Sequence, residues 1–158
     1  MNNSHTNLTR RKKSQEYAVS LDTNTVQELP EDPQGVNASR SRRVLIADDN
    51  RDGAESLAML LELSGHGVWV AYTGFQAVEM ATLHRPDVAI LDIGMPGLSG
   101  YEVAKHIRAQ TWGSRITLIA VTGWGQDADK RCAQSAGFDQ HLTKPVDLAT
   151  FEELLAAV

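Results

Sequence analysis

Three aspartates and one lysine, far apart in the chain, each stand where an apolar run ends. Asp48 and Asp49 follow one such run, Asp92 follows a second, and Lys144 follows a third. If these runs are parallel strands, the side chains converge at the edge of a sheet where open α/β folds bind their ligands. Clustered carboxylates repel one another and need a cation, and oxygen ligands of this kind suit Mg²⁺. Because the ammonium group of Lys144 can offset further negative charge, the four residues predict a magnesium site that handles a phosphoryl group.

The elements that must position these residues follow from the hydrophobic pattern after about residue 43. Continuous apolar runs are typical of strands that are covered on both faces of a sheet. The segments between them have apolar residues at helical spacing, such as Leu57 and Leu61 in a helix predicted over 52–64, with Asp52 as a candidate N-cap. Strands alternating with helices predict an α/β fold, a doubly wound five-stranded parallel sheet in a three-layer sandwich. The predicted strands are 44–47, 68–72, 88–91, 116–121 and 139–142.

Residues 1–42 differ in composition from the rest of the chain. They contain few large apolar residues and many Asn, Ser, Thr and charged residues. Such a segment cannot bury enough surface to offset its ordering entropy, so we expect a flexible N-terminal arm, with residues 43–158 as the folded domain. The basic run Arg10-Arg11-Lys12-Lys13 could contact nucleic acid or an acidic partner, although short runs of like charge are common on solvated tails.

Composition narrows the classes of function. The formal net charge of -5 disfavours nucleic acid as the main partner, because phosphate backbones attract basic surfaces. Cys132 is the only cysteine, so an internal disulfide is excluded and a reducing compartment fits. The chain has neither the roughly 18 consecutive apolar residues of a membrane span nor the apolar core of a secretory signal. We therefore expect a cytoplasmic protein without a membrane span.

With these positions placed, residues 43–158 resemble the receiver domain of two-component response regulators. Each part of the pattern is weak evidence alone, but their order along the chain, each at a predicted strand end, is specific. The resemblance implies the strand order 2-1-3-4-5 known from chemotaxis receivers. The parts are Asp48-Asp49, Leu91-Asp92, Met95-Pro96-Gly97 with Gly100, Val121-Thr122 and Lys144-Pro145.

The resemblance also implies a metal site around a phosphoryl acceptor. Asp92 would be the acceptor, since a carboxylate is a competent nucleophile once its charge is screened and its position fixed. Asp49 and Asp92, with the backbone carbonyl of Gly94, would hold Mg²⁺, and Asp48 would support it. The metal would lower the repulsion between the acceptor and the incoming phosphoryl oxygens.

Further groups would handle the phosphoryl oxygens. Lys144 would neutralise one, the hydroxyl of Thr122 would donate to another, and the backbone N–H of Gly123 could add a further donor. The implied function is that of a phosphoacceptor signalling domain rather than an enzyme. It would take a phosphoryl group from a histidine kinase or histidine phosphotransfer protein and then change its contacts with a downstream protein target. We expect slow self-catalysed phosphorylation and dephosphorylation and no direct DNA binding, and the pattern leaves a homodimer open.

Three residues depart from the usual receiver pattern. His141 stands three residues before Lys144, where many receivers carry Tyr or Phe. It either replaces that switch residue, moving together with Thr122, or is a surface histidine without a switching role. Gly94 has no side chain to orient an attacking water, and the bulky Trp124 could obstruct its path, which predicts slow loss of the phosphoryl group. Trp124 could equally be a partner-docking or loop-packing residue.

Two other functions on a doubly wound sheet compete with this interpretation. A phosphatase of the haloacid dehalogenase type also uses an aspartyl nucleophile, but its Asp-x-Asp pattern needs an acid where this chain has Gly94. A flavin-binding protein of the flavodoxin type needs a phosphate loop rich in Ser, Thr and Gly after the first strand. The chain has Asp48-Asp49-Asn50 there, whose charge opposes a phosphate.

Overall fold

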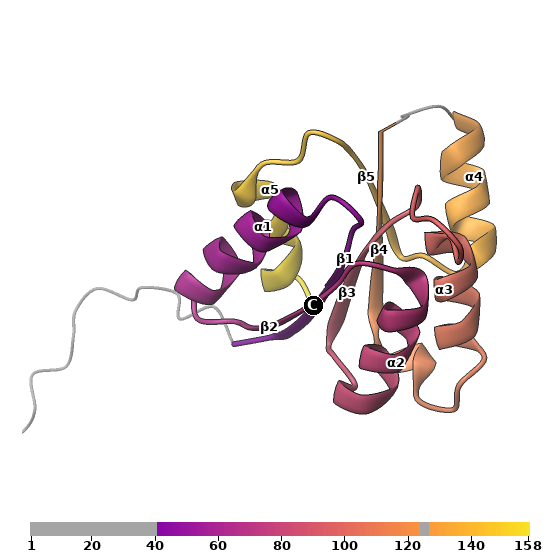
Figure 1. The fold of residues 1–158 in the computed structure, drawn as a ribbon, viewed down its shortest axis with the longest axis horizontal. Helices are drawn as coiled ribbons and strands as arrows, with labels where there is room; N and C mark the ends of the chain where they lie inside the picture. The colour runs from indigo at the N-terminus through magenta and orange to yellow at the C-terminus, as the bar shows by residue number, and fades with distance from the viewer. Residues whose placement is uncertain (1–40, 124–126) are drawn as a thin grey trace, which may run out of the picture. The chain divides into compact units, whose positions relative to one another are not determined.

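The computed structural model describes residues 41–123 and 127–158, which form a parallel β-sheet with helices on both faces (Figure 1). The strands are hydrogen-bonded in the order β2-β1-β3-β4-β5, and every pair is parallel. This arrangement confirms the predicted fold class and strand order. The strands are β1 (Arg43–Ala47), β2 (Gly67–Ala71), β3 (Val88–Asp92), β4 (Thr117–Thr122) and β5 (Gln140–Thr143).

The helices pack in two layers. The helices α1 and α5 cover one face of the sheet, and α2, α3 and α4 cover the other (Figure 1). A short 3-10 helix, η1 (Gly113–Arg115), precedes β4. No helix in the described residues is both long and apolar enough to cross a membrane. The α-helices are α1 (Arg51–Leu63), α2 (Gly74–His84), α3 (Gly100–Arg108), α4 (Asp127–Ala136) and α5 (Leu148–Ala156).

The sheet separates two apolar cores because successive side chains of a strand point to opposite faces. In β1, Val44 and Ile46 belong to the core beneath α1 and α5, whereas Leu45 and Ala47 belong to the core beneath α2, α3 and α4. All five side chains of β3, the central strand, are buried. Burial on both faces explains why these strands read as continuous apolar runs, and it fixes their register.

Polar caps set where the helices begin. The side chain of Asn50 accepts a hydrogen bond from the backbone N–H of Gly53 and caps α1, so the prediction that Asp52 is the cap is wrong. Ser99 and Glu102 form a reciprocal capping box at α3, and the hydrogen bonds from Ser99 lower the pKa of the Glu102 carboxyl. Each cap lies in a loop that leaves the carboxyl end of a strand, so it also fixes the loops around that edge of the sheet.

The predicted N-terminal arm, residues 1–42, lies almost entirely outside the described residues. Ser41 and Arg42 are the exceptions. The backbone N–H of Arg42 donates to Nδ1 of His66 at 3.1 Å, and its guanidinium donates to the backbone carbonyl of Leu155 at 3.3 Å. The boundary of the arm therefore stays a prediction, although residue 42 already contacts the domain.

Candidate functional site

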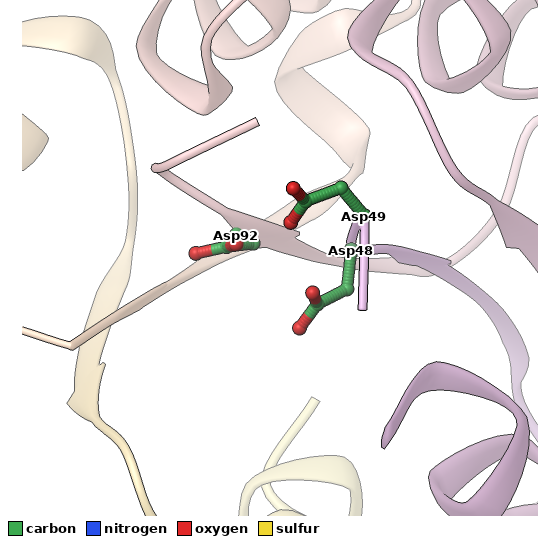
Figure 2. Close-up of side chains that lie close together, drawn as sticks. All are labelled: Asp48, Asp49 and Asp92. Carbon is green, nitrogen blue, oxygen red and sulfur yellow. The ribbon is translucent and has the colours of Figure 1, made fainter. Parts of the chain in front are cut away.

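Three carboxylates meet at the carboxyl edge of the sheet. Asp48 and Asp49 directly follow β1, and Asp92 is the last residue of β3. β1 and β3 are neighbours, with Ala47 opposite Leu91, so the residues just beyond this pair leave the sheet at the same level. One carboxylate oxygen from each aspartate lies within 4.8 Å of the other two (Figure 2). The cluster is thus a direct consequence of strand order and register.

Backbone hydrogen bonds hold these side chains beyond the regular strands. The backbone N–H of Asp48 donates to the carbonyl of Ala71 at 3.1 Å, which extends the pairing of β1 with β2. The Asp48 carboxylate accepts the backbone N–H of Asn50 at 2.9 Å, and that of Asp92 accepts the N–H of Gly94 at 3.2 Å. Both carboxylates are therefore oriented by the first turn of the loop that follows them.

Lys144 reaches the cluster from the last strand. Its Nζ lies 2.8 Å from Oδ2 of Asp48 and 3.4 Å from Oδ2 of Asp92. Its backbone N–H donates to the carbonyl of Thr122 at 2.7 Å, which continues the pairing of β4 with β5 up to the lysine. Burial lowers the pKa of Lys144, but the hydrogen bond to Asp48 and the charge of Asp92 outweigh it, so the pKa lies above its usual value. The ammonium group is charged at neutral pH.

Thr122 and Gly123 bring polar groups to the same edge. Thr122 is the last residue of β4, lies opposite Thr143 and is only 5% exposed. Gly123 follows directly, and a Cβ there would meet no described atom within 4 Å. Because β4 lies next to β3, both residues leave the sheet beside Asp92.

His141 lies on β5, opposite Ala120, and is half-buried. Its Nε2 is sealed from solvent and has no hydrogen-bond partner among the described residues. A buried polar atom without a partner is costly. Trp124 lies outside the described residues, so its two alternative roles stay predictions.

The charge balance of the site favours a small divalent cation. Three carboxylates lie close to one ammonium group, so the cluster keeps an excess of negative charge, and Asp92 carries its share in a buried position, only 8% exposed. The donors are hard oxygen atoms, which suit Mg²⁺. The residues present therefore fit the metal that the resemblance implies.

Sequence reasoning missed two features of the site. It did not predict that the ammonium group of Lys144 makes its shortest contact with Asp48; the role of Lys144 at a phosphoryl oxygen stays a prediction. It also overlooked Asn50, which caps α1 with its side chain and orients Asp48 with its backbone N–H. Asn is among the preferred N-cap residues, so the role of Asn50 as a cap could have been predicted.

A doubly wound sheet that gathers carboxylates, a lysine and a buried threonine at its carboxyl edge defines a class of phosphoacceptor signalling domains. Comparison with family models agrees, because the model of the response regulator receiver domain matches residues 44–157. The chain belongs to this family. It is a receiver domain of two-component systems.

Two curated relatives illustrate the family. The protein PilH of Pseudomonas aeruginosa is 37% identical over 116 residues, which are 73% of this chain and 96% of that protein. The response regulator MprA of Mycobacterium ulcerans is also 37% identical over 116 residues, but these are only 48% of its length. The chain thus spans nearly all of one relative and about half of the other.

Solved structures show the same fold. The receiver domain of a sensor histidine kinase from Pseudomonas aeruginosa superposes with a TM-score of 0.69 at 30% identity, covering 74% of this chain and 96% of that one. That structure has a magnesium ion coordinated in its active-site cleft. A chemotaxis protein from Vibrio cholerae gives a TM-score of 0.71 at 27% identity, covering 75% and 98%. The phosphatase alternative is not supported by these comparisons.

Proposed function

We propose that Asp92 is the phosphoryl acceptor of this receiver. A carboxylate oxygen of Asp92 attacks the phosphorus of a phosphohistidine on a histidine kinase or histidine phosphotransfer protein, and the phosphorus–nitrogen bond breaks. The observation that carries the proposal is the position of Asp92 between two further carboxylates and an ammonium group that lies 3.4 Å from its Oδ2. The carboxylates alone would repel an incoming anion. A cation held by them, together with Lys144, would offset the charge of that anion.

The metal ligands follow from the same cluster. Asp49 and Asp92, with the backbone carbonyl of Gly94, would hold Mg²⁺, and Asp48 would support it. When bound, the ion screens the charge between the acceptor and the phosphoryl oxygens. Gly94 and Asp92 are already linked by the hydrogen bond at 3.2 Å, so the loop holds both near one place.

The remaining groups bind the product. Lys144 would move its ammonium group from Asp48 towards a phosphoryl oxygen near Asp92, which it already approaches at 3.4 Å. The hydroxyl of Thr122 and the backbone N–H of Gly123 would donate to the other oxygens. We expect self-catalysed phosphorylation and dephosphorylation to be slow. For dephosphorylation the reason is that Gly94 offers no side chain to orient the attacking water.

Removing the ammonium group should separate its effects on metal binding and on phosphorylation. In Lys144→Met the ion pair with Asp48 is lost, so Mg²⁺ no longer competes with a neighbouring cation. We expect Mg²⁺ to bind about fivefold more tightly, a moderate screened charge effect, while phosphorylation becomes slower. Calorimetric titration with Mg²⁺ measures the first effect. Equal affinities in the two proteins would show that Lys144 is remote from the metal.

His141 is proposed as the switch residue that responds to phosphorylation of the site. Once Thr122 bonds a phosphoryl oxygen, the ring of His141 would turn and pair its buried Nε2. We therefore expect the ring resonances of His141 to shift on phosphorylation. The ring resonances of His66 serve as the control. His66 lies directly before β2, and its Nδ1 already accepts the backbone N–H of Arg42. Unchanged His141 resonances in the phosphorylated protein would leave it without a switching role.

Phosphorylation by a small-molecule donor tests the proposed function directly. The protein is incubated with acetyl phosphate, with Mg²⁺ or with a chelator, and its intact mass is measured. A phosphoryl mass gain that needs Mg²⁺ and maps to the peptide containing Asp92 is the expected result. A gain on a serine, threonine or histidine, or the same gain in the chelator, would contradict the proposal. Repeating the experiment with a phosphorylated histidine phosphotransfer domain then tests the donor class.

A further inference from the structure

An exposed arginine lies close to the acid cluster without pairing with it. Arg51 is the first residue of α1 and follows Asp49 by two positions. Its guanidinium forms no ion pair within residues 41–123 and 127–158. It lies instead over the ring of Tyr72, with its central carbon 4.0 Å from the ring centroid, a distance at which a cation is attracted to an aromatic face.

The ring of Tyr72 is itself held in place from two sides. Its hydroxyl donates a hydrogen bond to the carboxylate of Glu55 on α1 at 2.9 Å, and its backbone N–H donates to the side chain of Gln76 at 2.9 Å. The hydrogen bond to Glu55 raises the pKa of the Tyr72 hydroxyl, so the ring beneath the guanidinium is a neutral phenol at neutral pH. Tyr72 thus offers Arg51 a fixed aromatic face.

This aromatic face lies at the same edge of the sheet as the acid cluster. Tyr72 directly follows β2, and the backbone N–H of Asp48 donates to the carbonyl of Ala71 at 3.1 Å, so Tyr72 and Asp48 leave neighbouring strands at the same level. Arg51 is also close to Asp49 along the chain, since two residues span at most about 7 Å. A long side chain at position 51 can bridge that span by rotating about its own bonds.

We propose that Tyr72 is a positioning residue of the metal site. Its ring holds the guanidinium of Arg51 away from Asp48 and Asp49, which leaves both carboxylates free for a divalent cation. The inference rests on the proposed magnesium site, and it assigns part of the affinity of that site to a residue outside the acid cluster. Without the ring, Arg51 would occupy the carboxylates and compete with Mg²⁺ for them.

A released arginine would have two acidic partners to choose from, Glu55 one turn along α1 and the acid cluster. The cluster brings three carboxylates together beside one ammonium group, so its excess of negative charge attracts a guanidinium more strongly than a single exposed carboxylate does. An acid four residues after a cation is also the less favourable order on a helix. Arg51 should therefore turn to Asp48 or Asp49.

Calorimetric titration with Mg²⁺ of two variants at position 72 tests the inference. In Tyr72→Leu the aromatic face is lost, and we expect Mg²⁺ to bind about threefold more weakly than to the wild type, as competition from an exposed ion pair would give. The matched control is Tyr72→Phe, which loses the hydrogen bond to Glu55 but keeps the ring beneath Arg51, so the wild-type affinity should persist.

Arg51→Met separates release of the arginine from a general disturbance of the site. When the arginine is absent, adding Tyr72→Leu should leave the Mg²⁺ affinity unchanged, because no cation is released. The same weakening with and without Arg51 would overturn the inference, and so would equal affinities in the wild type and Tyr72→Leu. In both cases Mg²⁺ binding to the wild type would still support the metal site, whereas a wild type that binds no Mg²⁺ would overturn both.

Discussion

Asp92→Asn is expected to show no phosphoryl mass gain with acetyl phosphate at any Mg²⁺ concentration. The carboxamide oxygen carries no negative charge and is a poor nucleophile, so the loss should be complete rather than partial. The effect is the largest we expect from a single change at the site. Intact mass after a long incubation measures it, and a circular dichroism melt shows that the variant is folded.

The matched variant Asp49→Asn separates the acceptor from a metal ligand. It removes one carboxylate of the same cluster but leaves Asp92 and its contact with Lys144 in place. Its phosphorylation should be slow at low Mg²⁺ and recover as the concentration rises, because only metal affinity is reduced. Recovery in Asp92→Asn as well, or full loss in Asp49→Asn at saturating Mg²⁺, would show that the two roles have been assigned wrongly.

The strands were predictable because the sheet is buried on both faces. The residue at which each strand ends was harder to predict. β3 includes Asp92 and β4 includes Thr122, whereas the apolar runs end one residue earlier. A polar side chain after an apolar run is typical of a loop, and the sequence does not show that backbone pairing continues. Here it does continue, since the N–H of Ile93 donates to the carbonyl of Val121 at 3.1 Å.

Contacts between side chains from distant elements were beyond the sequence pattern. The pattern placed Lys144 and the aspartates at one edge, but which carboxylate the ammonium group contacts depends on how β5 and its following loop sit against β1. A cavity of about 650 Å³ between α1 and the segment that joins β5 to α5 was missed for a related reason, because its volume depends on the separation of these elements. The sequence also did not show which apolar residues of α1 are exposed. Met59 is 63% exposed, although it is apolar like its buried neighbours.

Gly100→Ala is expected to lower the free energy of unfolding by about 3 kcal/mol, at the upper end of the cost of overpacking a core. Gly100 is the first residue of α3, and it packs against the strand end that carries Asp92. A Cβ on Gly100 would lie 2.4 Å from the carbonyl oxygen of Asp92 and 3.0 Å from Cα of Ile93. Both are backbone atoms, at the end of the central strand β3 and in the residue that follows it, so neither can rotate away as a flexible side chain would.

Gly67→Ala is the matched control for this steric effect. Gly67 begins β2, and its Cβ would come no closer than 3.9 Å to its nearest neighbour, the carbonyl oxygen of Arg42. We expect a change within about 0.5 kcal/mol, as for ordinary surface substitutions. Urea denaturation of both variants gives the comparison, and similar midpoints would show that α3 can shift without cost. If α3 shifts instead by moving the backbone of Asp92, Gly100→Ala should also weaken Mg²⁺ binding, whereas Gly67→Ala should leave it unchanged.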